Sequence, residues 1–190
     1  MTDISPLREF VQSMTHLVEQ ESDEQRLMDR ASKHLSALIA RDDWLPDAFA
    51  QPDPRHYQQY LLYCDPLERF CVVSFVWGPG QTTPVHDHTV WGLVGLLRGS
   101  ERCQEYAQGD GCMRMTGEHE IGPGAIDRVS PRIGDIHKVS NALSDRASIS
   151  IHVYGGNIGA THRHVYDVET GAVRDFVSGY TDAPLPNLWR

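Results

Sequence analysis

The chain has 190 residues, with 17 basic and 26 acidic side chains and a formal net charge of -9. That length suits one well-packed domain with an appended element and excludes two enzymatic domains of ordinary size. The acidic balance leaves no basic stripe that could neutralise a phosphate backbone, which excludes nucleic acid as a partner. No apolar run reaches the length of a membrane span and the N-terminus lacks a signal-peptide pattern, so we expect a cytoplasmic protein.

Two amphipathic helices are predicted at the N-terminus. The first has Ser5 as its N-cap and Pro6 in its first helical position. Its apolar stripe consists of Leu7, Phe10, Val11, Met14, Leu17 and Val18. The second begins at Ser22, whose spacing to Gln25 suits a capping box. Its buried stripe is expected to contain Leu27, Ala31, Leu35, Leu38 and Ile39.

The stretch 42–57 contains Pro46, Pro52 and Pro54, which end helices and indicate a connector without a folded element of its own. We therefore expect a helical segment at 1–56 that packs on a β region at 57–190, the two forming one structural domain. In the β region, short apolar or alternating runs are separated by Gly, Pro, Asp and Asn turns, which predicts an all-β sandwich or barrel.

These runs occupy residues 60–63, 70–77, 90–97, 147–154, 161–168 and 172–177. The last two are expected to form a hairpin that turns near Gly171. The end of the chain at 184–189 is expected to be extended and to cover the barrel.

Histidines in two segments suggest a metal site. His86 and His88 stand at a strand edge, where the period of two directs both imidazoles to one face of the sheet. His137 lies in a separate predicted strand that a barrel can bring opposite the first two. Three neutral imidazoles leave the charge of a divalent ion uncompensated and about three coordination positions open, which favours anionic ligands. Neither ligand type nor spacing separates iron from zinc.

The two histidine segments together resemble the paired signatures of the cupin superfamily, G-x5-H-x-H-x(3,4)-E-x6-G and G-x2-H-x3-N. The matching residues are Gly80, His86, His88, Gly99, Gly134, His137 and Asn141. The carboxylate ligand of the signature falls at Gly92, which has no side chain. The resemblance implies a mainly β fold, a cupin barrel (double-stranded β-helix or jelly roll) with N-terminal α-helices, holding one mononuclear metal ion.

In the run 147–154 polar and apolar residues alternate, so Ser150, His152 and Tyr154 share one face of a strand. That face either lies in water, as on many antiparallel sheets, or lies inside the barrel. In the second case a hydroxyl, an imidazole and a phenol in line can orient one another. They can then present the Tyr154 proton to a metal-bound ligand.

From Tyr57 to Tyr166 the chain closely resembles the cysteine dioxygenase family, the thiol dioxygenases of cupin fold. The resemblance rests on YQQYLL, on W-G-x-G before H-D-H-T, on G-D-I-H-K-V-S-N and on S-x-H-x-Y-G-G. It implies an enzyme that holds Fe(II) on His86, His88 and His137 and binds a small thiol as thiolate beside O2. Both oxygen atoms transfer to sulfur to give a sulfinic acid, and the thiol supplies the electrons, so no organic cofactor is expected.

Two departures from the animal enzymes concern the substrate. The cysteine that crosslinks to their active-site tyrosine corresponds to Gly92, so Tyr154 is expected to be unmodified. Their carboxylate-binding arginine corresponds to Gln59. Both departures resemble the bacterial branch associated with 3-mercaptopropionate, where an arginine shortly after the S-x-H-x-Y strand, here Arg163, binds the carboxylate. The resemblance therefore implies 3-mercaptopropionate or L-cysteine as substrate, with Arg163 and Gln59 as its anchor. A surface charge is the alternative role of Arg163.

Other functions remain open on the sequence. A different cupin enzyme, such as a zinc- or manganese-dependent isomerase or a dioxygenase of carbon substrates, predicts activity without thiols. A non-catalytic module that binds a small acid predicts ligand binding without oxygen consumption. The sequence does not determine the preferred thiol, the metal bound after purification, the protonation of the Ser150, His152 and Tyr154 relay, or the oligomeric state.

The remaining histidines and the cysteines are assigned no chemistry. His162 and His164 form a second H-x-H without the glycine spacing of the first and are expected on the surface or behind the metal ligands. His56 and His119 are expected in loops. The cysteines form no C-x-x-C pair and are expected to be reduced thiols that pack as small hydrophobes. They are Cys64, Cys71, Cys103 and Cys112.

Overall fold

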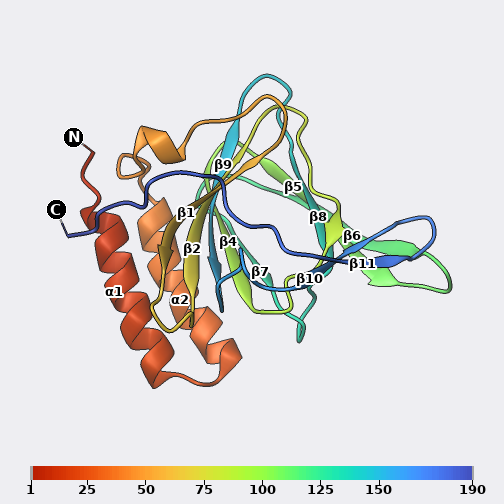
Figure 1. Cartoon of the computed structure of the whole chain (residues 1–190), viewed down its shortest axis with the longest axis horizontal. Coiled ribbons are helices and arrows are strands. Elements are labelled where there is room, and N and C mark those ends of the chain that lie inside the picture. The colour runs from red at the N-terminus through yellow and green to blue at the C-terminus, as the bar shows by residue number, and fades with distance from the viewer. Residues whose placement is uncertain (1, 190) are drawn as a thin grey trace.

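The computed structural model describes residues 2–189 and has two helices packed against a β-barrel (Figure 1). The helices are α1 (Ser5–Gln20) and α2 (Glu24–Ile39), and a 3-10 turn, η1, spans Asp47–Phe49. The strands are β1 (Gln58–Cys64), β2 (Cys71–Trp77), β3 (Val85–His86), β4 (Gly92–Arg98), β5 (Glu101–Gln108), β6 (Met113–Ile121), β7 (Ile126–Val129), β8 (His137–Asn141), β9 (Ser148–Tyr154), β10 (Arg163–Tyr166) and β11 (Val173–Phe176).

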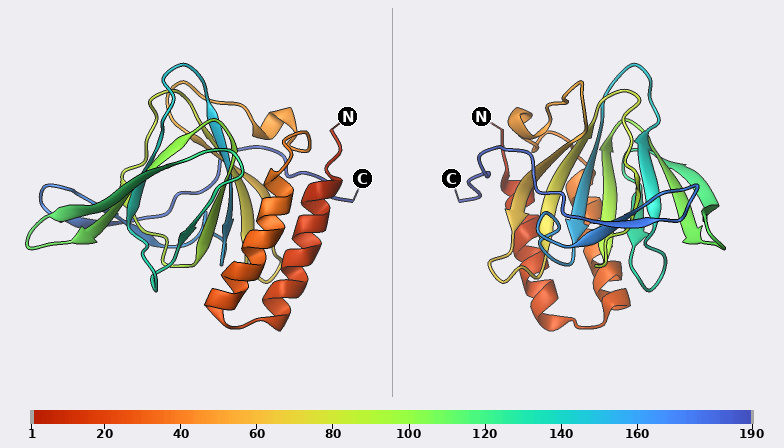
Figure 2. Two further views of the ribbon diagram at one scale, coloured as in Figure 1. Left: turned by 180° about the vertical axis from the view of Figure 1, so that it is seen from behind. Right: turned by 45° about the vertical axis from the view of Figure 1, so that its right-hand side comes forward.

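The strands pair antiparallel in two sheets that close into a mainly β cupin barrel, which confirms the predicted fold class. One sheet has the order β1-β2-β9-β4-β7 and the other β11-β10-β3-β8-β5-β6. The two helices cover the outer face of the first sheet, and the hairpins β5–β6 and β10–β11 project from the opposite side of the molecule (Figure 2). The space between the sheets is therefore the place for a buried site.

Strand β9 lies between β2 and β4 in the first sheet, and all 7 of its residues are buried. Its apolar side chains pack into the core that the sheet shares with α1 and α2. They are Ile149, Ile151 and Val153. Because side chains alternate along a strand, Ser150, His152 and Tyr154 point the other way, into the barrel. The alternative of a polar face in water is therefore wrong for this strand.

Both helix starts differ from the predictions by one residue. The N-cap of α1 is Ile4 rather than Ser5, which is already helical. The N-cap of α2 is Asp23, whose carboxylate accepts a hydrogen bond from the backbone N–H of Arg26 at 2.9 Å. The predicted cap at Ser22 is wrong because the carboxylate one residue later satisfies the free N–H groups and complements the helix dipole. No helix within residues 2–189 is long and apolar enough to span a membrane.

The buried stripes of both helices agree with the predicted ones, with Val18 only partly buried and with Met28 added to the second. Four of the six predicted β runs contain the whole of a strand, the run 90–97 contains all of β4 except Arg98, and the first, 60–63, lies within β1. Strands β5, β6 and β7 were not predicted. In β5 and β6 the outward positions are charged and the apolar alternation is weak. Their burial alternates only partially along the strands, as expected for a hairpin exposed on one side.

The connector and the tail are more ordered than predicted. Trp44 is fully buried and donates its Nε1–H to the carbonyl oxygen of Leu38 at 2.9 Å. Phe49 also lies in the core, so the stretch 42–57 is part of the packed structure. The predicted hairpin forms, with Gly171 at a positive φ of 65°. The tail at 184–189, which was predicted to cover the barrel, has Leu188 packed into the core that the helices share with the first sheet, near α1 (Figure 1).

Candidate active site

Three histidine side chains meet inside the barrel. His86 ends the short strand β3 and pairs with His137 at the start of β8, while His88 follows β3 by two residues. Their side chains are buried, and each pair of ring centroids is 4.9 Å apart. Their nitrogen atoms lie close enough to share one ion. The fold therefore brings together the three histidines singled out in the sequence.

The outer nitrogen of each ring has a partner in the surrounding protein. Nδ1 of His86 lies 3.1 Å from the carbonyl oxygen of Pro84, Nδ1 of His88 lies 3.0 Å from Oδ1 of Asp135, and Nδ1 of His137 lies 3.4 Å from Sγ of Cys103. Partners at Nδ1 fix the ring orientation and leave Nε2 as the available ligand atom. The three rings thus offer three Nε2 atoms to a shared cation.

The protonation of the rings also suits a cation. Burial, followed by the proximity of His88, lowers the pKa of His86 to about 3, and the same two causes hold the pKa of His137 well below its ordinary value. A neutral imidazole has the free electron pair that a metal requires. The arrangement therefore fits a divalent metal ion held by three histidines.

Asp135 was not singled out in the sequence, although it stands two residues before His137 in the G-D-I-H segment. Its carboxylate accepts hydrogen bonds from the backbone N–H groups of His88 at 3.0 Å and Thr89 at 2.9 Å, besides its contact with the His88 ring. Thr89 has a positive φ of 60°, a strained conformation that this carboxylate stabilises. Burial alone raises the pKa of Asp135, but these hydrogen bonds lower it overall.

We expect Asp135→Asn to weaken Fe(II) binding about 10- to 100-fold, because an amide no longer anchors the His88 ring with a negative charge. The measurement is an anaerobic competition titration against a chelator. The matched control is Asp145→Asn, since the Asp145 side chain is 72% exposed in a turn. Equal iron affinity in both variants contradicts the orienting role of Asp135.

The polar residues of β9 form a continuous hydrogen-bonded chain. Ser150 Oγ lies 2.8 Å from Nε2 of His152, whose Nδ1 lies 2.7 Å from the hydroxyl of Tyr154. Nε1–H of Trp77 donates to Ser150 Oγ at 3.3 Å, and the ring of Phe75 stacks on His152. Burial raises the pKa of Tyr154 and lowers that of His152, so both are neutral at physiological pH.

Tyr154 borders the histidine group on one side and Gly92 on the other. Its ring stacks on His88 with 5.4 Å between centroids. A Cβ atom at Gly92 would lie 2.8 Å from Cδ1 of Tyr154, and the two residues are paired between β4 and β9. A side chain at position 92 would therefore contact the Tyr154 ring, whereas glycine offers no side-chain atom that could bond to it.

Arg163 reaches the same cavity, a space of about 30 Å³ that is also lined by Gln59, Tyr154 and the three histidines. The Arg163 residue is 4% exposed, which excludes its role as a surface charge. Its Nη2 donates to Ser178 Oγ at 2.6 Å and its guanidinium lies over the ring of Phe176. Its buried Nε–H has no hydrogen-bond partner within residues 2–189. A buried cation with a free donor suits an anionic ligand.

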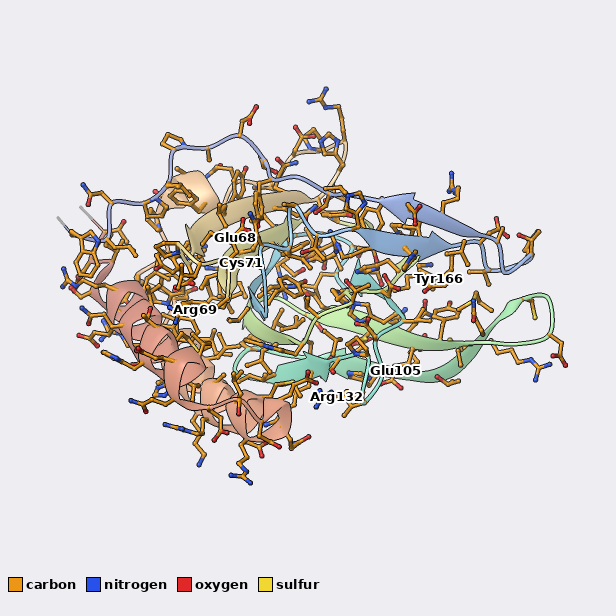
Figure 3. All side chains as sticks on the ribbon, turned by 60° about the horizontal axis from the view of Figure 1, so that its bottom comes forward. Glu68, Arg69, Cys71, Glu105, Arg132 and Tyr166 are labelled. Atoms are coloured by element: carbon orange, nitrogen blue, oxygen red, sulfur yellow. The ribbon has the colours of Figure 1, made fainter. Side chains whose placement is uncertain are left out.

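Within residues 2–189 the second H-x-H belongs to no group of possible metal ligands, but it supports the first. His164 Nδ1 and its backbone N–H each lie 2.7 Å from the carboxylate of Asp87, which also accepts the hydroxyl hydrogen of Tyr166 at 2.8 Å. Asp87 lies between His86 and His88, so this contact ties β10 to the histidine segment. His162 is exposed. Figure 3 labels Tyr166 on β10.

Glu101 is a buried carboxyl group that the sequence did not single out. It is 1% exposed, its Oε1 accepts from Ser148 Oγ at 3.2 Å, and its Oε2 has no partner within the described chain. Burial raises its pKa from 4.5 to about 8. The group is therefore mostly protonated at pH 7, which avoids a buried unpaired charge.

The raised pKa makes a pH-dependent contribution to the free energy of unfolding. The folded state holds the Glu101 proton more tightly than the unfolded chain, so stability falls as pH rises from about 4.5 towards about 8. Between pH 6 and pH 9 we expect the metal-free protein to lose about 3 kcal/mol from this group. In Glu101→Gln that loss is expected to disappear, as measured by denaturant unfolding across this range. Parallel pH profiles for the two proteins contradict the assignment.

The other unassigned residues are placed as follows. The cysteines are free thiols, with Cys71 and Cys103 buried and Cys64 and Cys112 half-buried. His56 lies in a loop, but His119 lies in strand β6, which corrects the loop prediction. The wrong placement follows from the missed β5–β6 hairpin.

Comparisons with known proteins relate the chain to one family, and several solved structures resemble it distantly. The model of the family described as cysteine dioxygenase type I matches residues 7–167. The crystal structure of TT1209 from Thermus thermophilus is similar at 18% sequence identity, covers 58% of this chain and 92% of that chain, and has a TM-score of 0.46.

Two further solved structures are similar at the same level. An uncharacterized conserved protein with a double-stranded beta-helix domain from Klebsiella pneumoniae is 20% identical in sequence. The match covers 62% of this chain and 93% of that chain, with a TM-score of 0.46. A Cupin 2 conserved barrel domain protein from Salinispora arenicola is also 20% identical. That match covers 58% of this chain and 83% of that chain, with a TM-score of 0.42. These likenesses support no particular activity.

Proposed function

The chain belongs to the cysteine dioxygenase type I family, and from this premise we propose that it is an Fe(II)-dependent thiol dioxygenase. Its substrate is a small thiol that carries a carboxylate, 3-mercaptopropionate or L-cysteine, and its product is the sulfinic acid. The observation that carries the proposal is that Arg163, Tyr154 and the three histidines line one buried cavity. An anion site, a hydroxyl donor and a metal site thus lie within reach of one small molecule.

His86, His88 and His137 would hold the iron through their Nε2 atoms. The fit rests on the lowered pKa values of His86 and His137, on the outer partners at each Nδ1 and on the 4.9 Å spacing of the ring centroids. When bound, Fe(II) supplies a place where thiol sulfur and O2 meet and exchange electrons, so that both oxygen atoms end on sulfur. Three neutral ligands add no negative charge that would compete with a thiolate.

Arg163 binds the substrate carboxylate in this proposal. Its Nε–H is the free donor, and its guanidinium is held in place by Ser178 and by the ring of Phe176. A fixed guanidinium can form two parallel hydrogen bonds to a carboxylate, and Gln59 on β1 adds a neutral amide to the same cavity. The anchor holds the sulfur end of the molecule towards the histidines, which is a contribution of positioning.

The charges of the cavity favour 3-mercaptopropionate over L-cysteine. Among the described residues that line the cavity there is no aspartate or glutamate, and the one charged side chain is Arg163. The ammonium group of cysteine would therefore lie near a cation without a carboxylate to pair with, which carries a desolvation cost. A thiol without an amino group avoids that cost.

The hydrogen-bonded series Ser150–His152–Tyr154 on β9 can hold the Tyr154 hydroxyl in one orientation. Tyr154 directs its proton into the cavity when Nδ1–H of His152 donates to the phenol oxygen. Because a neutral imidazole carries one proton, Nε2 of His152 then accepts from Ser150, whose Oγ accepts from Trp77. In this arrangement Tyr154 donates a hydrogen bond to the reacting oxygen or to the substrate, and the chain behind it keeps the donor aligned.

The test is oxygen uptake by protein that has been loaded with Fe(II) under anaerobic conditions. We expect rapid uptake with 3-mercaptopropionate, slower uptake with L-cysteine and little with cysteamine, which lacks the carboxylate. Sulfinate should form in a ratio of one to each O2 consumed. Zinc-loaded protein and the variant His137→Ala serve as controls and should consume no oxygen.

Other outcomes correct or overturn the proposal. A preference for L-cysteine shifts the substrate assignment but keeps the reaction. Absence of uptake with any thiol, in protein shown to hold iron on the three histidines, overturns the enzymatic assignment and favours a module that binds a small acid. Uptake with a carbon substrate in the absence of thiols assigns a different cupin chemistry.

A further inference from the structure

A second group of possible metal ligands lies between the two sheets, outside the three-histidine group. Cys103 on β5 and His119 on β6 are directly paired across the hairpin, so their side chains share one face. Asp127 on β7 of the other sheet faces them, and its Oδ2 lies 2.7 Å from Nε2 of His119. One ligand atom from each residue lies within 4.8 Å of the others.

This group borders a cavity of its own. The cavity has a volume of about 340 Å³ and is lined by Cys103, His119, Asp127 and Glu105, among others. It shares His137 as a wall with the smaller cavity of the active site. Glu105, labelled in Figure 3, points from the same face of β5 as Cys103, and its Oε1 lies 3.8 Å from Nδ1 of His119. An ion therefore has both ligands and space at this place.

We propose that Cys103, His119 and Asp127 form a second metal site, which binds a zinc ion. A thiolate, an imidazole and a carboxylate are the three ligand types that zinc takes in proteins, whereas Mg²⁺ and Ca²⁺ require oxygen ligands. With Zn–S near 2.3 Å and Zn–N near 2.1 Å, tetrahedral ligand atoms lie about 3.5 Å apart. The present ligand atoms lie within 4.8 Å of one another, so a pair at that limit must approach by little more than about 1 Å to reach this spacing.

The side chains have the freedom to make these rotations. The side chain of His119 is 40% exposed and that of Asp127 is 24% exposed, while Cys103 is fixed in the wall. Binding breaks the hydrogen bond between His119 and Asp127 and releases the thiol proton of Cys103 to solvent. The thiolate and the carboxylate together balance the charge of the ion. Water or Glu105 can supply the fourth ligand.

The site also touches the active site. Sγ of Cys103 lies 3.4 Å from Nδ1 of His137. A zinc-bound thiolate there accepts the Nδ1–H of His137 and so fixes its tautomer and orientation, as outer partners of metal-bound histidines do. The second ion therefore supports one ligand of the first site without entering the reaction.

Cobalt(II) is the probe, since it replaces zinc and a sulfur ligand gives it an intense near-ultraviolet charge-transfer band. The three-histidine site has no sulfur, so the band reports the second site alone. In reduced, chelator-treated protein we expect the band to saturate within two equivalents of cobalt, one for each site, and excess zinc to remove it. The variant His86→Ala is expected to keep the band, which makes the result independent of the proposed function.

Variants identify the ligands. We expect Cys103→Ser to abolish the band and Cys112→Ser, the same change at a half-buried position in the β5–β6 turn, to keep it. His119→Ala, at a more exposed position, is expected to weaken cobalt binding at least tenfold without affecting the fold. Absence of the band in the wild-type protein overturns the proposal. An unchanged titration in either Cys103→Ser or His119→Ala also overturns it.

Discussion

Replacement of Tyr154 by phenylalanine is expected to lower kcat about 100-fold while the protein keeps its full iron content. The variant removes a single hydroxyl, which lies 2.7 Å from Nδ1 of His152 and faces the cavity. A positioned proton donor contributes typically 10²- to 10⁴-fold to a rate, and the lower end applies if Tyr154 aligns a reacting oxygen without transferring its proton. Iron binding depends on Nε2 atoms that do not touch the hydroxyl.

The measurement is steady-state oxygen uptake at saturating thiol, together with iron content of the same samples. Tyr60→Phe is the matched control, because it also removes a buried, hydrogen-bonded phenol but outside the cavity, where the hydroxyl donates to the carbonyl oxygen of Gln51. We expect the control to keep the wild-type rate. Full turnover by Tyr154→Phe at saturating thiol and oxygen would show that the hydroxyl has no part in the reaction.

The three-histidine group could be predicted from sequence because its geometry is local. His86 and His88 lie two residues apart, so both side chains can reach one ion even though β3 ends at His86, and the glycine spacing around His137 marks a second strand. Asp135 could not be predicted in the same way. Its role depends on a backbone conformation at Thr89 that brings two N–H groups to one carboxylate, and no sequence period reveals that contact.

The direction in which β9 faces could not be decided from its sequence either. Its alternation defines two faces, but both are buried, one against the helices and one inside the barrel. Only the packing of α1 and α2 on the apolar face directs His152 and Tyr154 into the cavity. The β5–β6 hairpin was missed for the related reason that its charged outer positions conceal the alternation. That omission placed His119 in a loop and hid its pairing with Cys103.

Arg163→Lys is expected to lower kcat/KM for 3-mercaptopropionate about 100-fold and to leave the low rate with cysteamine nearly unchanged. Lysine keeps the positive charge but loses the planar pair of donors, including the buried Nε–H that has no partner within the described chain. Hydrogen bonds to a charged group contribute about 1.5–3 kcal/mol each, so loss of the paired geometry accounts for a reduction of that size. The loss should fall mainly on KM, because the carboxylate lies away from the reacting sulfur.

The comparison between two thiols separates binding of the carboxylate from damage to the site. A distorted cavity slows both substrates, whereas a lost anchor slows only the thiol that has a carboxylate to bind. Arg174→Lys is the matched control, since Arg174 is exposed on β11, the strand paired with β10, and is expected to behave as wild type. If Arg163→Lys slows the reactions of cysteamine and 3-mercaptopropionate by the same factor, Arg163 supports the structure of the cavity and another group must bind the carboxylate. Of the two carboxylate-binding residues predicted from the sequence, Gln59 then remains.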